Sequence, residues 1–201
     1  MVSLDTCEPF FEYMRKSVEL DAHTMESVAA RTTEATFGEN QILLSEGNIC
    51  NKVYFLLSGT ARSYYTDYSG NTTTWAFHFN DEFSFTRNLF AVDYGSFLTG
   101  KPSTVTIEAL SELRVLVFSK DGVNDLIEHS SKYERWMRKL DETSYLYMRD
   151  RAFTLLTMSA TERYQKLLNE EPHLMQMFSN YYIASYLGIA PQSLSRIRTH
   201  H

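Results

Sequence analysis

Short apolar runs separated by turn residues fill the middle of the chain. These runs are residues 41–44, 53–57, 61–65 and 113–118. Further on, Trp75, Phe77 and Phe79 alternate with polar or small residues, and 104–109 repeats this two-residue period. Such a period places one face of a strand on a core and the other toward solvent or a second sheet. Because seven of the eight glycines also lie in this part, the pattern predicts many short strands in a β-sandwich or jelly roll.

Both ends of the chain are predicted to be helical. Apolar spacing indicates two helices within 10–30 and a short helix over 120–129. Ser131 and Glu134 have the spacing of a capping box, which marks the start of a further helix. No Pro or Gly follows before about residue 158, so this helix would be roughly 40 Å long at ~1.5 Å per residue.

The long helix carries an imperfect seven-residue repeat. Its predicted dimer-facing residues are Tyr133, Met137, Leu140, Tyr147 and Met158. Ser144 and Arg151 interrupt the repeat with polar side chains. The helix could lie on its own β-domain. A seam between two copies is favoured, because a small domain hardly covers so long an aromatic-rich helix.

Two short helices are predicted near the carboxyl end, after a helix that starts with a capping box at 159–162. Ser179 can cap the first of the pair, Gly188 supplies a sharp turn, and Pro191 suits the first position of the second. The residues predicted to face outward from the second helix are Gln192, Ser193, Ser195, Arg196 and Arg198. This arrangement is typical of a helix-turn-helix that enters a DNA major groove, although a generic helical hairpin has the same pattern.

Composition and charge narrow the chemistry. The 201 residues are 43 % hydrophobic and 22 % charged, which is typical of a folded protein. The net charge is −6, yet no Asp or Glu occurs from Pro172 onward, so a small basic tip could contact phosphates. No apolar run of 18 residues and no secretory signal are found, so we expect a cytoplasmic protein that does not enter membranes.

Motifs for catalysis or metal binding are missing from the sequence. Cys7 and Cys50 are too few for a four-cysteine zinc or iron–sulfur site and are expected to be reduced thiols. His78 is the lone histidine of the β-region, so a metal-dependent barrel enzyme lacks its ligands. There is no phosphate-binding glycine loop. We therefore expect no enzymatic activity, no metal and no cofactor.

The string YYIASYLGIAPQSLSRIR, from Tyr181 to Arg198, resembles the helix-turn-helix of the Crp/Fnr superfamily of bacterial transcription regulators, especially its compact Bacteroidetes members. Gly38-Glu39, Ser45-Glu46-Gly47, the run from Val53 to Gly59, and Ser69-Gly70 lie where a cyclic-nucleotide-binding β-roll has its turns. The resemblance implies an α+β fold with three parts. These are a β-roll sensor with N-terminal helices at 1–130, a dimerisation helix at 131–158 and a helix-turn-helix domain at 159–201.

The same resemblance implies a homodimer that binds a pseudo-palindromic site on double-stranded DNA, with RNA polymerase as a further candidate partner. Gln192, Ser193 and Arg196 would meet base edges, while Ser195 or Arg198 would meet a phosphate. The superfamily's best-known members have an arginine where Pro191 stands, so the DNA sequence recognised should differ from theirs.

Departures from the family pattern concern the sensor. Cyclic-AMP-binding members carry Gly-Glu and a later Arg-Ser or Arg-Thr, whereas this chain is expected to offer Phe85-Thr86 and Lys101-Pro102-Ser103-Thr104 there. Without those charges a cyclic phosphate would stay unpaired, so no tight cyclic-nucleotide binding is expected. The predicted pocket of an unidentified effector contains Phe85, Thr86, Arg87, Lys101, Ser103 and Thr104. Lys101 or Arg87 could serve another anion, or be solvated surface charges.

An alternative is a degenerate family member that dimerises or binds a protein without recognising DNA. The sequence stops three residues after Arg198, and no phosphate-gripping β-hairpin wing follows the second helix. The terminal histidines could also be a tag remnant.

Overall fold

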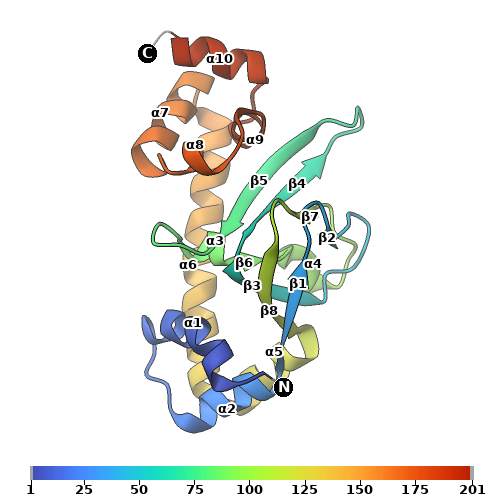
Figure 1. Cartoon of the computed structure of the whole chain (residues 1–201), viewed down its shortest axis with the longest axis vertical. Helices are drawn as coiled ribbons and strands as arrows, with labels where there is room; N and C mark the ends of the chain where they lie inside the picture. Colours follow the sequence, from blue (N-terminus) through green and yellow to red (C-terminus); the bar gives the residue numbers. More distant parts are fainter. Residues whose placement is uncertain (1, 200–201) are drawn as a thin grey trace.

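The computed structural model describes residues 2–199 and shows a β-roll beside one long helix (Figure 1). The strands are β1 Thr32–Phe37, β2 Ile42–Leu44, β3 Lys52–Ser58, β4 Thr60–Thr66, β5 Thr72–Phe79, β6 Phe90–Ala91, β7 Thr106–Ala109 and β8 Leu113–Ser119. They form two four-stranded antiparallel sheets, ordered β1-β8-β3-β6 and β2-β7-β4-β5. The predicted α+β jelly-roll fold is confirmed.

Helices cover both ends of the molecule. They are α1 Leu4–Arg15, α2 Ala22–Ala30, α3 Thr86–Leu89, α4 Tyr94–Thr99, α5 Lys120–His129, α6 Ser131–Thr157, α7 Ala160–Glu170, α8 Leu174–Met177, α9 Asn180–Tyr186 and α10 Pro191–Thr199. Helix α6 runs along the long axis, with α1, α2 and α5 at one end and α7–α10 at the other (Figure 1). Short helices α3, α4 and α8 were not predicted, because four to six residues carry too little periodicity to show a helix.

Turn chemistry explains how the strands are joined. Asp67 accepts hydrogen bonds from the main-chain amides of Ser69 and Asn71 and closes the β4–β5 hairpin. Gly59 joins β3 to β4 with φ +88°, and a Cβ there would lie 2.1 Å from the Glu112 carbonyl oxygen. Only glycine fits this position, because both the backbone conformation and the space exclude a side chain.

The main core lies between the β-roll and the N-terminal helices. Phe10 of α1 packs edge-on against Phe55 of β3 and Trp136 of α6, with ring centroids 5.2 Å apart in both pairs. Cys7 and Cys50 are free and buried, and burial raises the pKa of the Cys7 thiol to about 11. The first turns of α6 are therefore part of the core of the β-roll.

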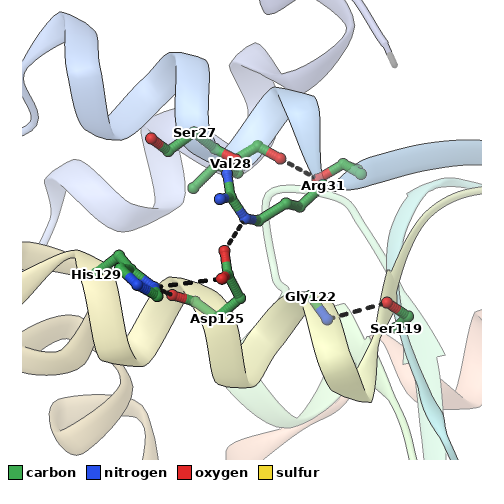
Figure 2. Close-up of polar contacts among 8 residues, drawn as sticks. Ser27, Val28, Arg31, Ser119, Gly122, Asp125 and His129 are labelled. Atoms are coloured by element: carbon green, nitrogen blue, oxygen red, sulfur yellow. Dashed lines mark hydrogen bonds and ion pairs between the residues drawn. The ribbon is translucent and has the colours of Figure 1, made fainter.

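Polar contacts attach α2 to α5 at the same end (Figure 2). The Arg31 guanidinium pairs with the Asp125 carboxylate, and His129 Nδ1 lies 3.2 Å from the same carboxylate. Ser119 caps α5 by accepting a hydrogen bond from the Gly122 amide at 3.1 Å. Because α5 then leads into α6 through one residue, these contacts fix the direction in which α6 leaves the β-roll.

The connection between α5 and α6 differs from the sequence prediction in one respect. The residue that caps α6 is Ser130, whose hydroxyl accepts from the Tyr133 amide at 3.2 Å, and Ser131 is already helical. Ser130 alone separates α5 from α6, and its extended backbone leaves its hydroxyl free to act as the cap. The second predicted capping box, Ser159 with Glu162, is confirmed.

Candidate functional site

The two C-terminal helices form a compact pair. Ser179 caps α9, Gly188 turns the chain with φ +65°, and Pro191 is the first residue of α10. The side chains of Ile183, Leu187 and Leu194 are buried between the helices and their neighbours. The sequence folds this way because its small and aliphatic residues recur on one side of each helix, which leaves the opposite side of α10 polar.

Helix α10 lies at the extreme end of the molecule (Figure 1). Gln192, Ser195 and Arg196 are exposed, and Ser193 is half-buried. The Arg196 guanidinium makes no hydrogen bond or ion pair within residues 2–199. Arg198 is also exposed, but its guanidinium donates to the Asn180 side chain at 2.8 Å and so ties α10 to the start of α9.

The helix pair rests on the outer face of β5. Phe77 stacks on Phe178 with centroids 3.9 Å apart, and Phe79 lies against the same C-terminal cluster. The Ser185 hydroxyl donates to the Thr72 carbonyl and accepts from the Thr74 amide, both at 2.8 Å. The C-terminal helices therefore complete their core with side chains from the β-roll.

Two arginines strengthen this contact. Arg87 of α3 pairs with Glu171 after α7 at 2.5 Å, and Glu171 also accepts a hydrogen bond from Tyr186 at 3.3 Å. Arg151 of α6 is buried, donates to the Tyr186 carbonyl oxygen and lies 3.9 Å above the Tyr186 ring. Both guanidiniums thus connect the sensor or the long helix to the helix pair.

Side-chain burial along α6 corrects the predicted dimer seam. Tyr133 is only 2 % exposed and belongs to the sensor core, while Met137 and Leu140 pack against that core. Tyr147 lies against Arg87, with its ring 4.7 Å from the guanidinium. The repeat predicted between two copies is thus largely the contact of α6 with its own β-roll, since aromatic and aliphatic residues at seven-residue spacing suit either contact. Met158, the remaining residue, lies just past the end of α6.

A different set of apolar side chains on α6 faces solvent. We call it the α6 stripe, and it consists of Tyr145, Leu146, Met148, Phe153 and Leu156. Leu156 is 84 % exposed and Phe153 is 59 % exposed. Exposed apolar side chains gathered on one helix face mark an interaction surface more often than isolated ones do.

A cavity of about 720 Å³ opens between the β-roll and α6. Trp75, Ala76 and His78 of β5, Phe90, and Trp136 of α6 are among the residues that line it. Trp75 was expected on the same face as Phe77. A bulge opposite Ser63 and Tyr64 breaks the alternation of β5, so Trp75 lines the cavity while Phe77 packs on the C-terminal helices.

His78 is the buried titratable group of this cavity. It is 3 % exposed, and its Nε2 atom lies 2.7 Å from the Ser63 hydroxyl. Its Nδ1 atom has no hydrogen-bond partner within the described residues. Burial lowers the pKa of His78 to about 4, and the nearby main chain of Arg87 and Phe90 offsets this only in part. The imidazole is therefore neutral at pH 7.

Only three of the six residues predicted to form the effector pocket line this cavity. Phe85, Thr86 and Arg87 line the cavity, as expected. The other three, Lys101, Ser103 and Thr104, do not line it. Lys101 and Thr104 are exposed, because the α4 loop carries them to the surface, and Ser103 is buried where its hydroxyl donates to the Asp93 carboxylate at 2.6 Å.

Asp93 is the residue that sequence reasoning missed in this loop. Its carboxylate also accepts from the Ser96 amide at 3.2 Å and so caps α4. One feature of the sequence could have pointed to it. Asp93 lies two positions before Gly95 and ten before Ser103, close to the segment in which the charged ligands of a cyclic nucleotide were expected.

Comparison with known proteins begins with a family model described as the cyclic nucleotide-binding domain, which matches residues 34–130. Residues 34–130 are therefore similar to this domain. No curated protein matches the sequence. Among solved structures, FixK2 from Bradyrhizobium japonicum superposes with a TM-score of 0.70 at 18 % identity, covering 84 % of this chain and 83 % of that one.

Two further structures extend the likeness. The c-di-GMP-responsive global regulator CLP from Xanthomonas campestris has a TM-score of 0.68 at 16 % identity, covering 90 % of this chain and 91 % of its own. A protein from Eubacterium rectale assigned to the crp/fnr family of transcriptional regulators has a TM-score of 0.65 at 15 % identity, covering 90 % and 83 %. The chain therefore has the Crp/Fnr fold from its β-roll to its helix pair.

The charges of this Crp/Fnr fold do not fit a cyclic nucleotide. Of the residues that line the cavity, only Arg87 and Asp141 are charged. Arg87 is held by Glu171, and the exposed Asp141 carboxylate would repel a phosphate. Within the described residues, no group of three or more His, Cys, Asp or Glu is arranged to hold a metal ion. No described helix has both the length and the apolar character that crossing a membrane requires.

Proposed function

We propose that this chain is a homodimeric, DNA-binding transcription regulator with an N-terminal sensor domain. The observation that carries the proposal is the polar side of α10, where Gln192, Ser195 and Arg196 face solvent from a helix held rigidly on its partner. Arg can pair with guanine through two hydrogen bonds, and Gln can pair with adenine in the same way. The Crp/Fnr fold supports the same interpretation.

Each residue of α10 has a distinct role in this proposal. Gln192, Ser193 and Arg196 contact base edges, while Ser195 and Arg198 contact phosphates. The hydrogen bond of Arg198 to Asn180 orients the guanidinium before DNA arrives. Since the stretch from Pro172 carries no acidic residue, this surface does not repel the backbone phosphates.

Dimerisation is assigned to the α6 stripe in place of the residues expected from the repeat. Leu146, Phe153 and Leu156 are spaced by seven and three residues, the spacing of a coiled-coil seam. Two-fold symmetry would then present two α10 helices to a pseudo-palindromic site with half-sites about 34 Å apart. RNA polymerase remains a candidate partner of the DNA-bound dimer.

The sensor does not bind cyclic AMP tightly in this proposal, because the cavity lacks a free cation for the phosphate. The effector acts by shifting α6 and the helix pair, since α6 lines the cavity at one end and holds Tyr186 through Arg151 at the other.

The test of DNA recognition is selection from genomic fragments, followed by anisotropy titration of the selected site. We expect affinity to fall steeply with salt, and Arg196→Ala to cost roughly 1–3 kcal/mol and relax one base position. Arg138→Ala is the matched control, because Arg138 is an exposed arginine of α6 that pairs with Glu142. Absence of any enrichment at low salt would favour the alternative of a protein-interaction module.

The test of the dimer is sedimentation of the full chain. We expect Leu156→Glu to shift a dimer to monomers, since it places a charge in an apolar seam. Leu4→Glu, at an exposed leucine of α1, should leave the dimer intact. A dimer that survives Leu156→Glu would show that another surface joins the copies.

A further inference from the structure

The cavity between the β-roll and α6 has walls suited to an apolar ligand. Aromatic rings dominate the lining, and the chain's two tryptophans, Trp75 and Trp136, are both part of it. Its volume of about 720 Å³ falls within the ~300–1,000 Å³ of small-molecule sites. The following inference names the ligand class of this sensor and rests on the function proposed above.

Neither charged group of the lining favours an anionic ligand. The Arg87 guanidinium is held by Glu171 and lies 4.6 Å from the Phe85 ring. The Asp141 carboxylate is exposed and accepts a hydrogen bond from the Tyr94 hydroxyl at 2.6 Å. An anionic ligand would have to break the Arg87–Glu171 pair or remain unpaired among aromatic rings, which is strongly unfavourable, so an uncharged ligand fits better.

His78 is the histidine of this wall, and it adds no charge to it. Burial keeps its imidazole neutral at pH 7, and Nε2 lies 2.7 Å from the Ser63 hydroxyl. The Nδ1 atom is buried near the main chain of Arg87 and Phe90, so neither nitrogen is open to an occupant of the cavity.

We propose that this cavity binds an uncharged, compact, mainly apolar small molecule in place of a nucleotide. The molecule fills the space between the aromatic rings of β5, β6 and α6. It would contact both Arg87 and α6, which connect the cavity to the C-terminal helices through Glu171 and Tyr186.

The test uses two probes that share one hydrocarbon cage, adamantane-1-methanol and adamantane-1-carboxylate. Neither absorbs near 280 nm, so the emission of Trp75 and Trp136 reports binding to the full chain directly. We expect saturable binding of the alcohol at one molecule per chain and at least tenfold weaker binding of the carboxylate. Cyclic AMP should give no saturable change at millimolar concentration. Equal or tighter binding of the carboxylate, or micromolar binding of cyclic AMP, would overturn the proposal.

Variants locate the probe. Ala76→Phe fills the cavity from β5 and should weaken the alcohol at least tenfold, whereas Phe153→Ala, in the α6 stripe, should leave it unchanged. If Ala76→Phe does not fold, the smaller change Ala76→Leu serves instead and should weaken binding of the alcohol in the same direction. Loss of binding in Phe153→Ala alone would place the probe on the stripe and contradict the proposal.

The two experiments distinguish failure of the proposed ligand class from failure of the proposed function. The fluorescence titration contains no DNA, and the DNA selection contains no probe. Failed probe binding with intact DNA recognition overturns only the ligand class. Probe binding as expected with no DNA recognition overturns the regulator.

Discussion

The two faces of β5 differ in chemistry and in what they support. The inner face presents Trp75, Ala76 and His78 to the cavity, whereas the outer face presents Phe77 and Phe79 to the C-terminal helices. One strand therefore lines the cavity with one face and packs against the C-terminal helices with the other. Both faces belong to one strand that is hydrogen-bonded to β4, so the cavity and the C-terminal helices share a structural element.

The largest expected effect comes from the outer face. Phe77→Ala removes the ring that stacks on Phe178 and leaves a void, which typically costs about 3–5 kcal/mol. We expect hydrogen exchange to rise in α7–α10 while β3 and β8 stay protected. Tyr68→Ala, at a fully exposed hairpin position, should change stability by less than about 0.5 kcal/mol. Uniform loss of protection across the β-roll would show that the two units unfold together.

The inner face of β5 should make the stability of the protein depend on pH, through His78. Because the folded pKa of His78 is about 4 and the unfolded value is near 6.5, the unfolded chain alone binds a proton between these values. Stability is therefore fully present above pH 6.5 and falls as pH approaches 4, by up to roughly 3 kcal/mol. Urea unfolding at pH 7 and 4.5 measures this. His78→Phe should flatten the dependence, and His129→Gln, at an exposed histidine, should not.

A smaller effect is expected at the ion pair beside β5. Glu171→Gln leaves Arg87 without its carboxylate, and partial solvent access reduces the cost to about 1–3 kcal/mol. A double-mutant cycle with Arg87→Gln measures the coupling between the two residues. Glu142→Gln breaks the exposed pair with Arg138 and should cost less than about 0.5 kcal/mol. A coupling near zero would mean that the pair does not link sensor and helix pair.

The smallest expected effect concerns Ser185, whose hydroxyl bridges the main chain of Thr72 and Thr74. Ser185→Ala removes both hydrogen bonds and should cost about 1 kcal/mol, measured as faster hydrogen exchange in α9. Ser195→Ala is a suitable control, because Ser195 is exposed on α10. Equal effects of the two substitutions would argue that α9 does not depend on β5.

The comparison of the two faces also shows the limit of periodicity. The alternation of Trp75, Phe77 and Phe79 predicted a strand, and β5 is that strand. It also predicted that these three rings share one face, which is wrong, because the bulge opposite Ser63 and Tyr64 turns Trp75 inward. A bulge adds one residue to a ladder and depends on the partner strand, so the sequence of β5 alone does not reveal it.

The long helix teaches the same lesson. Its length and start were predictable from the lack of Pro and Gly and from a capping serine, to within one residue. The contacts made by each face of α6 were not predictable in this way. Arg151 interrupted the apolar repeat, and in the structure its guanidinium holds the Tyr186 carbonyl oxygen. A seven-residue apolar repeat indicates that one face of a helix is buried. It does not indicate whether that face packs against the same chain or against a second copy.

Local chemistry, written in the sequence, determined the strands, the turn at Gly188, the start of α10 at Pro191 and the outward position of Arg196. These features depend on residues a few positions apart, so propensity, capping and periodicity suffice to predict them. Tertiary structure alone decided that Asp93 faces Ser103, that Arg87 holds Glu171 and that His78 is neutral beside a cavity. Such features arise when segments far apart in the chain exclude water from one another, and no local pattern encodes that encounter.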